Sequence, residues 1–224
     1  MKIALAGNPN SGKTTLYNGI TGKSEHVGNW SGVTVAKKES DLKKKYNSKG
    51  LDVRIVDLPG TYSISPFTGE EAITRDFILD EEPDVIINIV DGANVSRSLF
   101  FTTQLLELGI PVVIALNKSD IVSQRGDTID HTALSKELNC MVIATTATSE
   151  DGLKNLINEA VKLGMEKKPQ IAADFTGKAS DDSDIARQKF VDVIVKRCQV
   201  KKRDASKINF SDKMDRVIAH KWLG

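Results

Sequence analysis

Gly7-Asn-Pro-Asn-Ser-Gly-Lys-Thr14 is the stretch of sequence that decides the fold of this chain. It follows an apolar run at residues 2–6 and precedes a helix-like segment at residues 15–20, so strand, loop and helix come in the order of a phosphate-binding loop. Gly7 and Gly12 let successive backbone N–H groups turn towards one phosphate, and the positive end of the helix adds to the attraction. The stretch predicts a polyphosphate site contacted by Asn10, Ser11, Gly12, Lys13, Thr14 and Thr15, with Lys13 on the β- and γ-phosphates and the Thr14 hydroxyl on Mg²⁺.

Composition excludes several classes of protein. The chain has 224 residues, of which 40% are hydrophobic and 27% charged, and its net charge is +1. These values predict a globular domain of ordinary size with a small appendage, and they give no electrostatic reason to expect nucleic acid as a partner. Cys140 and Cys198 lack metal-ligand spacing, which favours a reducing compartment. No apolar stretch approaches the ~18 residues of a membrane span, and the first apolar run is too short for a signal peptide.

The pattern of apolar residues predicts an α/β fold. Short, continuous, β-branched runs are typical of strands buried on both faces, and they lie at residues 3–6, 53–56, 85–90, 112–116 and 141–144. Segments with helical periodicity alternate with them, at residues 13–20, 70–79, 95–108, 131–138 and 152–163. The turn-rich Asn47-Ser-Lys-Gly50 would join residues 33–45 and 51–56 as an antiparallel hairpin. We therefore predict a mostly parallel six-stranded sheet with one antiparallel hairpin and helices on both faces.

The composition changes after Gly164. Residues 165–184 are polar and turn-prone, which indicates a linker between a domain at residues 1–164 and a small helical appendage at residues 185–224. Two amphipathic helices are predicted in the appendage, at residues 185–195 and 211–223, with Ser183 and Ser211 as N-caps.

Basic residues gather along the predicted hairpin. The cluster contains lysines 37, 38, 43, 44, 45 and 49 together with Arg54. Such a cluster is typical of a solvated sheet edge, and a contact with anionic lipid headgroups is the alternative.

Two further segments supply predicted contacts to the metal and the γ-phosphate. Asp57-Leu-Pro-Gly60 follows an apolar run, so the Asp57 carboxylate can hold Mg²⁺ through water while Gly60 offers its N–H to the γ-phosphate. Thr34 lies between the phosphate loop and Asp57, and its hydroxyl can complete the Mg²⁺ shell while a γ-phosphate is present. An ordinary strand threonine is the alternative interpretation of Thr34.

The base is predicted to be guanine. Asn117-Lys-Ser-Asp120 follows a buried run, at the carboxyl end of a strand where ligands bind in open α/β sheets. The Asp120 carboxylate can accept hydrogen bonds from the ring N–H and the exocyclic amine of guanine, whereas adenine would leave this acid unpaired. Thr146-Ala-Thr148, after the last strand, would close over the base edge with backbone N–H groups. The predicted site for GTP or GDP therefore includes Asn117, Lys118, Asp120, Thr146, Ala147 and Thr148.

With these motifs, the chain resembles the cytosolic G domain of the ferrous-iron transport protein B (FeoB) family. The resemblance rests on the phosphate loop, Val27-Gly-Asn-Trp-Ser-Gly-Val-Thr-Val35, Asp57-Leu-Pro-Gly-Thr-Tyr-Ser63 and Glu70-Glu71, and it resumes in the last residues, 211–224. It implies a Ras-like P-loop GTPase that regulates or gates Fe²⁺ uptake at the cytoplasmic face of the cell (inner) membrane, the fragment itself being soluble. The implied partners are the membrane-spanning portion of the same polypeptide, small cytosolic proteins of the transport system and a second copy of the chain. The family's helical domain is longer, so the appendage here is predicted to be reduced.

Slow hydrolysis is expected, because Thr61 stands where Ras-type enzymes place a water-orienting glutamine. The resemblance to this family and to other cation-activated GTPases implies that Asn10 coordinates K⁺ in the place of an arginine finger. Backbone carbonyls around Gly28 and Trp30 would complete that site, although Asn10 as a residue that only stiffens the loop is the alternative. The Trp30 ring would either shield the nucleotide or pack down on the domain. Under this hypothesis the catalytic residues are Asn10, Lys13, Thr34 and Gly60.

Two alternatives of other classes stay open. One is a free-standing soluble GTPase of ribosome or tRNA maturation, which the near-neutral charge and the specific match at residues 27–35 disfavour. The other is a module that senses GTP against GDP with negligible turnover. An iron site within the chain is not expected, because His26, His131 and His220 are scattered.

Overall fold

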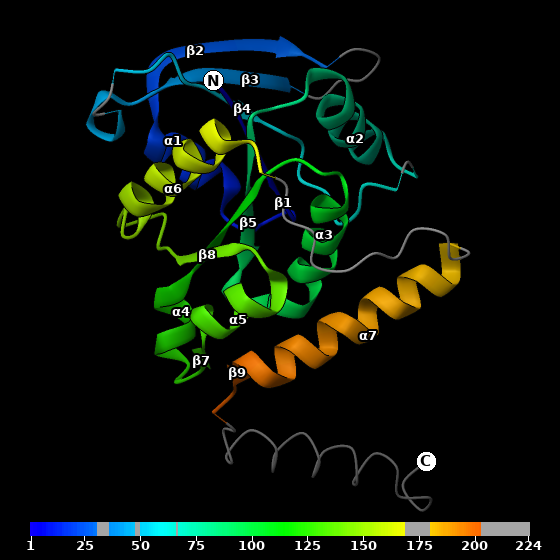
Figure 1. Ribbon diagram of the computed structural model, residues 1–224. Helices are drawn as coiled ribbons and strands as arrows, with labels where there is room; N and C mark the ends of the chain where they lie inside the picture. Colours follow the sequence, from blue (N-terminus) through cyan, green and yellow to red (C-terminus); the bar gives the residue numbers. More distant parts are fainter. Residues whose placement is uncertain (31–35, 48–49, 66, 169–179, 203–224) are drawn as a thin grey trace, which may run out of the picture.

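A mixed β-sheet forms the centre of the molecule. The computed structural model describes residues 1–30, 36–47, 50–65, 67–168 and 180–202, and in these residues the sheet has seven strands in the order β2-β3-β4-β1-β5-β6-β8 (Figure 1). The parallel strands are β1 (Lys2–Gly7), β4 (Arg54–Asp57), β5 (Val85–Asp91), β6 (Val112–Asn117) and β8 (Met141–Ala144). The two antiparallel members are β2 (Thr21–Asn29) and β3 (Ala36–Leu42). The predicted mostly parallel sheet with an antiparallel β3–β4 hairpin is confirmed.

The prediction of six strands is wrong by one strand. The segment TGKSEHVGN forms β2 although it is polar and carries no apolar run. It pairs with β3 at one edge of the sheet, where a strand needs no buried face on both sides. The sequence signal used to find the other strands is therefore missing from this one.

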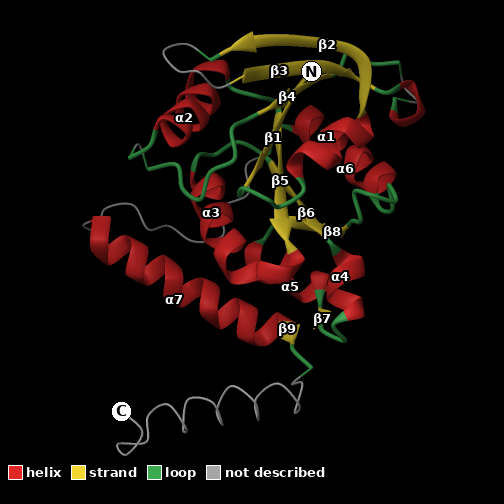
Figure 2. Ribbon diagram, turned by 180° about the vertical axis from the view of Figure 1, so that it is seen from behind, coloured by secondary structure: helices red, strands yellow, loops and turns green. Residues whose placement is uncertain are grey.

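Two helical layers cover the sheet on opposite faces (Figures 1 and 2). Successive residues of β5 alternate between two cores, with Ile87 and Ile89 facing one and Ile86 and Val90 facing the other. The first core lies under α1 (Lys13–Ile20) and α6 (Leu153–Glu166), and the second under α2 (Gly69–Glu81), α3 (Val95–Glu107) and α5 (His131–Leu138). Because both faces of the sheet are covered, the central strands β5 and β6 are buried at every position and mostly apolar.

All five helices predicted before residue 164 are present. A sixth helix, α4 (Ser119–Gln124), was not predicted, because its six residues are too few to show a helical period. Two short 3₁₀ turns, η1 (Lys44–Tyr46) and η2 (Gly92–Asn94), complete the connections of this part of the chain. The start of α2 is closed by a capping box in which Thr68 accepts from the Glu71 N–H and the Glu71 carboxylate accepts from the Thr68 N–H.

The last helix of the described residues, α7 (Ser180–Cys198), packs on the main domain. Val191, Ile194 and Cys198 are buried in the core shared with α3 and α5. After α7, β9 (Gln199–Val200) pairs antiparallel with β7 (Thr128–Ile129). The N-cap predicted at Ser183 is wrong because the helix begins at Ser180. The domain limits at residues 164 and 185 stay predictions, and the second predicted helix, 211–223, lies outside the described residues.

The basic cluster is paired with local acceptors. Arg54 lies 3.8 Å from Glu39 and 4.0 Å from Asp41, Lys37 lies 2.9 Å from Glu39, and Lys45 pairs with Glu150. Lys43 donates to the carbonyl oxygens of Asn18 and Gly19 at the end of α1, at 2.8 Å each. These contacts favour the solvated sheet edge over a lipid-binding surface.

Both cysteines are expected to react only after unfolding. Burial raises the pKa of the Cys140 thiol to about 12 and also raises the pKa of Cys198. At pH 8 the thiolate of Cys140 is then about one part in ten thousand of the thiol, and only the thiolate is the nucleophile. Labelling with Ellman's reagent should be slow in buffer and fast in denaturant. Rapid labelling of the folded chain would contradict this burial.

Candidate functional site

The loop between β1 and α1 has the backbone shape of a phosphate cradle. Gly12 has φ 94°, and a Cβ at this position would lie 2.3 Å from the Nδ2 of Asn117. A Cβ at Gly7 would lie 2.8 Å from the carbonyl oxygen of Ile89. Asn10 is left-handed as well, with φ 64°, a conformation that asparagine tolerates better than most residues. Glycine is therefore required at positions 7 and 12 for steric reasons, independently of any ligand.

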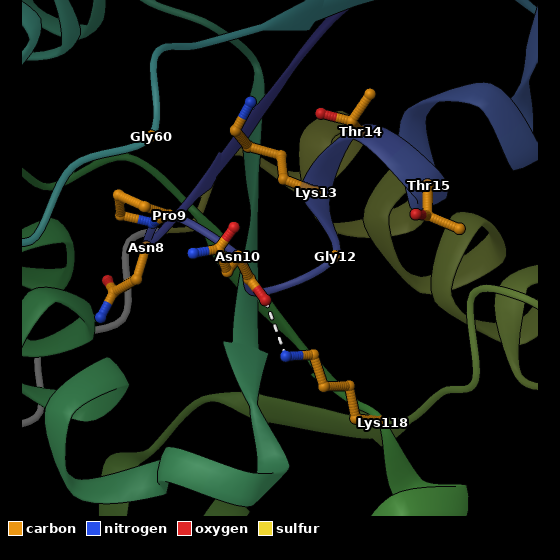
Figure 3. Close-up of a pocket in the computed structure, with 9 residues that line it drawn as sticks. All are labelled: Asn8, Pro9, Asn10, Gly12, Lys13, Thr14, Thr15, Gly60 and Lys118. Atoms are coloured by element: carbon orange, nitrogen blue, oxygen red, sulfur yellow. Dashed lines mark hydrogen bonds between the residues drawn. The ribbon is translucent and has the colours of Figure 1, made fainter.

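This loop forms one wall of an open cavity of about 480 Å³. The cavity brings together seven of the residues predicted from the motifs (Figure 3). They are Asn10, Gly12, Lys13, Thr14, Thr15, Gly60 and Lys118, the last of which directly follows β6. Asn8 and Pro9 also line it, and neither was predicted as a site residue because both occupy variable positions of the motif. Ser11 does not line the cavity: it is fully buried, and its carbonyl oxygen accepts from the Nδ2 of Asn117 at 2.9 Å.

Lys13 and Asp57 form a direct ion pair beside this cavity. Their side chains are 10% and 11% exposed, so both charges are largely withdrawn from water. A phosphate would compete with Asp57 for the ammonium group, and the released carboxylate would be free for a cation. The oxygens of Asp57 and Thr14 are the hard ligands that suit Mg²⁺. Thr34, the third predicted Mg²⁺ ligand, lies outside the described residues.

A second cavity, of about 150 Å³, adjoins the first because both are lined by Gly12, Thr15 and Lys118. Its other lining residues include the predicted base-binding residues Asn117, Asp120, Thr146, Ala147 and Thr148. The Asp120 side chain is exposed, and its carboxylate has no hydrogen bond or ion pair to any other described residue. An acceptor without a partner thus stands at the far end of a pocket that begins at the phosphate loop.

Asn117 and Lys118 connect the segments that line the two cavities. The buried Asn117 Oδ1 accepts from the Ala147 N–H at 3.0 Å, which ties the loop after β8 to the phosphate loop through Ser11. Lys118 is left-handed, with φ 63°, and its Nζ donates to the Asn10 carbonyl oxygen at 2.7 Å and to Asp91 at 2.9 Å. Asp91 was not predicted as part of the site; its place at the carboxyl end of β5 is the signal that could have found it.

Gly28 and Trp30 line neither cavity. Gly28 is paired with Lys37 in the β2–β3 ladder. The Trp30 ring packs edge-on against Phe77 of α2, with centroids 5.4 Å apart, and only 9% of Trp30 is exposed. Of the two alternatives for Trp30, packing down on the domain is the one that the structure shows.

The loop after Gly60 is closed by its own hydrogen bonds. The Thr61 hydroxyl donates to the carbonyl oxygen of Ser63 and accepts from the Ser63 N–H at 3.0 Å. Thr61 is 3% exposed, so its hydroxyl is not directed at the cavity to orient a water molecule. The Tyr62 ring lies 3.8 Å from the guanidinium of Arg97 on α3.

Within the described residues, no helix is at once long and apolar enough to cross a bilayer. The same part of the chain contains no group of three or more His, Cys, Asp or Glu side chains placed to hold a metal ion.

Comparison with known proteins places these features in a family. The family model described as "Ferrous iron transport protein B" matches residues 1–160. The Fe(2+) transporter FeoB of Escherichia coli is 43% identical over 171 residues, which are 75% of this chain and 21% of the relative. The Fe(2+) transport protein A/Fe(2+) transporter FeoB fusion protein of Porphyromonas gingivalis is 43% identical over 164 residues, 73% of this chain and 19% of the relative. The chain thus spans about a fifth of the length of the curated relatives that it matches.

Solved structures show the same fold. A GDP-bound mutant of the S. thermophilus NFeoB domain has a TM-score of 0.78 and 30% identity, and the match covers 89% of this chain and 100% of that one. The GMPPNP form of the cytosolic domain of T. maritima FeoB has a TM-score of 0.79 and 26% identity, with 90% and 100% covered. The Ras-like arrangement of sheet and helices predicted from the sequence is confirmed by these matches.

Proposed function

The chain belongs to the ferrous iron transport protein B family, and from this premise we propose that it is a G domain that binds GTP and hydrolyses it to GDP and phosphate. The observation that carries the proposal is the pair of adjoining cavities. One offers Lys13 and Thr14 to a polyphosphate, and the other offers Asp120 to the base. A guanine nucleotide is the ligand class whose two ends match both.

Each residue has a distinct proposed task. Lys13 exchanges Asp57 for the β- and γ-phosphates, and the Gly60 N–H contacts the γ-phosphate. Thr14, Asp57 and, when GTP is bound, Thr34 would hold Mg²⁺, which when bound neutralises charge on the phosphates. Gly12 and Thr15 line both cavities and shape the phosphate and ribose end of the site, and the buried Ser11 supports it by accepting from Asn117. Thr146, Ala147 and Thr148 close over the base. Because the Thr61 hydroxyl is engaged with Ser63, we propose slow intrinsic turnover.

Titration with GDP, GTP and ATP in the presence of Mg²⁺ tests the binding proposal. The chain should bind both guanine nucleotides and discriminate against ATP, whereas a preference for ATP, or no binding, would contradict it. A single-turnover assay with bound GTP then tests hydrolysis. Phosphate release supports the GTPase, and its absence supports a module that only senses GTP against GDP.

In its longer relatives the matching segment is part of an Fe²⁺ transporter, so we propose that this domain regulates or gates Fe²⁺ uptake from the cytoplasmic face of the membrane. Its proposed partners are the membrane portion of the same polypeptide, small cytosolic proteins of the system and a second copy of the chain. Translating the native gene past Gly224 tests this, because the transporter requires apolar spans of about 20 residues. A gene without such spans would support the free-standing GTPase instead.

We further propose that K⁺ accelerates hydrolysis through Asn10. Its side chain lines the phosphate cavity, and its carbonyl oxygen is held by Lys118, so the residue is fixed beside the place of the transferred phosphate. The carbonyls around Gly28 and Trp30 would have to approach Asn10 when nucleotide binds. GTP turnover should be on the order of tenfold faster in K⁺ than in Na⁺. This factor is modest for a positive charge that stabilises the transition state of phosphoryl transfer.

Asn10→Gly is the sharpest variant for this test, because glycine keeps the left-handed backbone at φ 64° and removes only the side chain. It should abolish the difference between K⁺ and Na⁺ at equal ionic strength. Asn155→Ala, on the exposed face of α6, is the matched control and should keep the difference. Equal rates of the unaltered chain in both salts would remove the proposal.

A further inference from the structure

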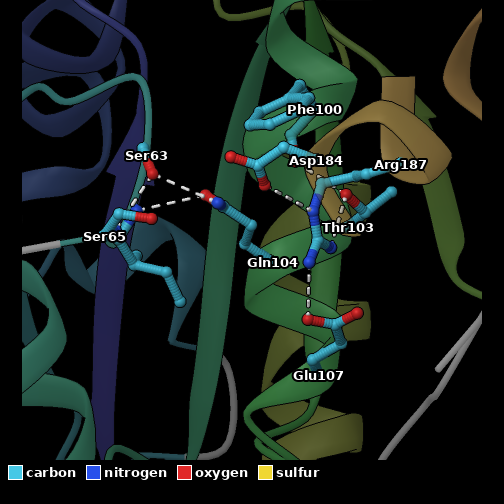
Figure 4. Close-up of polar contacts among 9 residues, drawn as sticks. Ser63, Ser65, Phe100, Thr103, Gln104, Glu107, Asp184 and Arg187 are labelled. Carbon is cyan, nitrogen blue, oxygen red and sulfur yellow. Dashed lines mark hydrogen bonds and ion pairs between the residues drawn. The ribbon is translucent and has the colours of Figure 1, made fainter. Parts of the chain in front are cut away.

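A buried side chain of α3 anchors the loop that follows Gly60. The Oε1 of Gln104 accepts from the Ile64 N–H at 3.1 Å, and its Nε2 donates to the Oγ of Ser63 at 3.1 Å. Figure 4 shows Gln104 extending from α3 towards Ser63. Gln104 is 5% exposed, and both polar ends of its amide are used. The loop therefore has a defined position relative to α3.

The same loop places Gly60 at the wall of the phosphate cavity. The Thr61 N–H donates to the carbonyl oxygen of Gly7 at 3.3 Å, and a Cβ at Gly60 would lie 3.4 Å from Pro9. The proposed contact of the Gly60 N–H is with the γ-phosphate, which GTP has and GDP lacks. A shift of the loop would therefore alter the affinity for GTP and leave that for GDP unchanged.

A second buried contact joins α3 to α7. The guanidinium of Arg187 donates to the Oγ1 of Thr103 at 3.1 Å and to Glu107 at 3.0 Å, and its Nε lies 3.8 Å from Asp184 (Figure 4). Arg187 is only 5% exposed, so the two carboxylates hold a charge that water cannot screen well. Thr103 precedes Gln104 in the chain, which means that α7 and the loop contact the same turn of α3 from different sides.

We propose that Gln104 positions the loop after Gly60 for the γ-phosphate, and that Arg187 holds the turn of α3 from which Gln104 acts. The seating of α7 then sets the preference of the site for the triphosphate over the diphosphate. This inference rests on the proposed function. Gln104 and Arg187 are positioning residues, since neither lines the nucleotide cavities.

The test compares the affinities for GMPPNP and GDP in matched variants of the full chain. Gln104→Met keeps the volume and removes both hydrogen bonds, so the ratio of GMPPNP affinity to GDP affinity should fall about tenfold, the weight of one to two ordinary hydrogen bonds. Arg187→Met should lower the ratio by a smaller factor. Arg197→Met is the control: it lies on the same helix, but its side chain is 63% exposed and pairs with Glu137 of α5, so the ratio should not change.

A double variant separates a relay from two independent effects. If Arg187 acts through Gln104, adding Arg187→Met to Gln104→Met should not change the affinity ratio any further. The double variant should then have the same ratio of GMPPNP affinity to GDP affinity as Gln104→Met alone. If the fold-change of the double variant equals the product of the two single fold-changes, the two residues act independently, and the proposed role of Arg187 is overturned. Amide hydrogen exchange in residues 61–65 should become faster in both single variants, because the Ile64 N–H loses its acceptor or the acceptor becomes mobile.

The remaining outcomes are also decisive. Equal weakening of GMPPNP and GDP by Gln104→Met would mean a merely structural role and overturn the inference, while the proposed function would stand. Failure of the unaltered chain to bind either nucleotide would contradict the proposed function itself. Should Gln104→Met fail to fold, Ser63→Ala removes one of the two bonds from the loop side; an unchanged ratio there would overturn the inference.

Discussion

Lys13→Ala is expected to weaken the binding of GDP and GTP by about a hundredfold or more. Lys13 lines the phosphate cavity, and the motif assigns its ammonium group to the β- and γ-phosphates. Each hydrogen bond to a charged group contributes about 1.5–3 kcal/mol. Isothermal titration with each nucleotide measures the loss. Lys162→Ala, an exposed lysine on α6, is the control that should bind as the unaltered chain does.

The same substitution should also destabilise the nucleotide-free chain. Without Lys13, the Asp57 carboxylate, which is 11% exposed, would lose its partner, and such an orphaned group costs on the order of 2 kcal/mol. Adding Asp57→Asn removes the stranded charge. Urea unfolding should therefore show stability recovered in the double variant, while nucleotide affinity stays low. If the single variant binds GDP normally, Lys13 is not the phosphate ligand and the proposed site is wrong.

Asp120→Asn is expected to exchange guanine for xanthine as the preferred base. Xanthine carries a carbonyl oxygen where guanine carries its exocyclic amine, so an asparagine amide can donate to that oxygen while accepting from the ring N–H. The carboxylate of Asp120 offers two acceptors instead, which suits guanine. Because the group has no other partner among the described residues, the substitution disturbs little else. The preference for GDP over XDP should invert, with a total change on the order of 10⁴.

Competition between labelled GDP and unlabelled XDP measures this change. Asp80→Asn, on the exposed side of α2, removes an acid from another helix and should keep the guanine preference. A variant that loses GDP without gaining XDP would show that Asp120 supports the pocket without reading the base.

Much of the fold and the ends of the site could be predicted from the sequence. Continuous apolar runs identified β1, β4, β5, β6 and β8, because a strand covered on both faces is mostly apolar along its length. The motifs follow those runs, and the carboxyl ends of parallel strands meet at one edge, so the gathering of Lys13, Gly60 and Asp120 was already implied. The polar edge strand β2 and the six-residue α4 lacked such a pattern and were missed.

Only the tertiary structure decided how side chains distant in sequence are paired. The partners of Lys13 and Lys118, the packing of Trp30 on Phe77 and the two bonds of Gln104 depend on which helix lies against which loop. The periodicity of apolar residues along the chain predicts whether a residue is buried. It does not predict which residue, distant in the sequence, will contact it. The sequence motifs determine which side chains belong to the site, whereas tertiary packing determines which of those side chains pair with each other in the absence of a ligand.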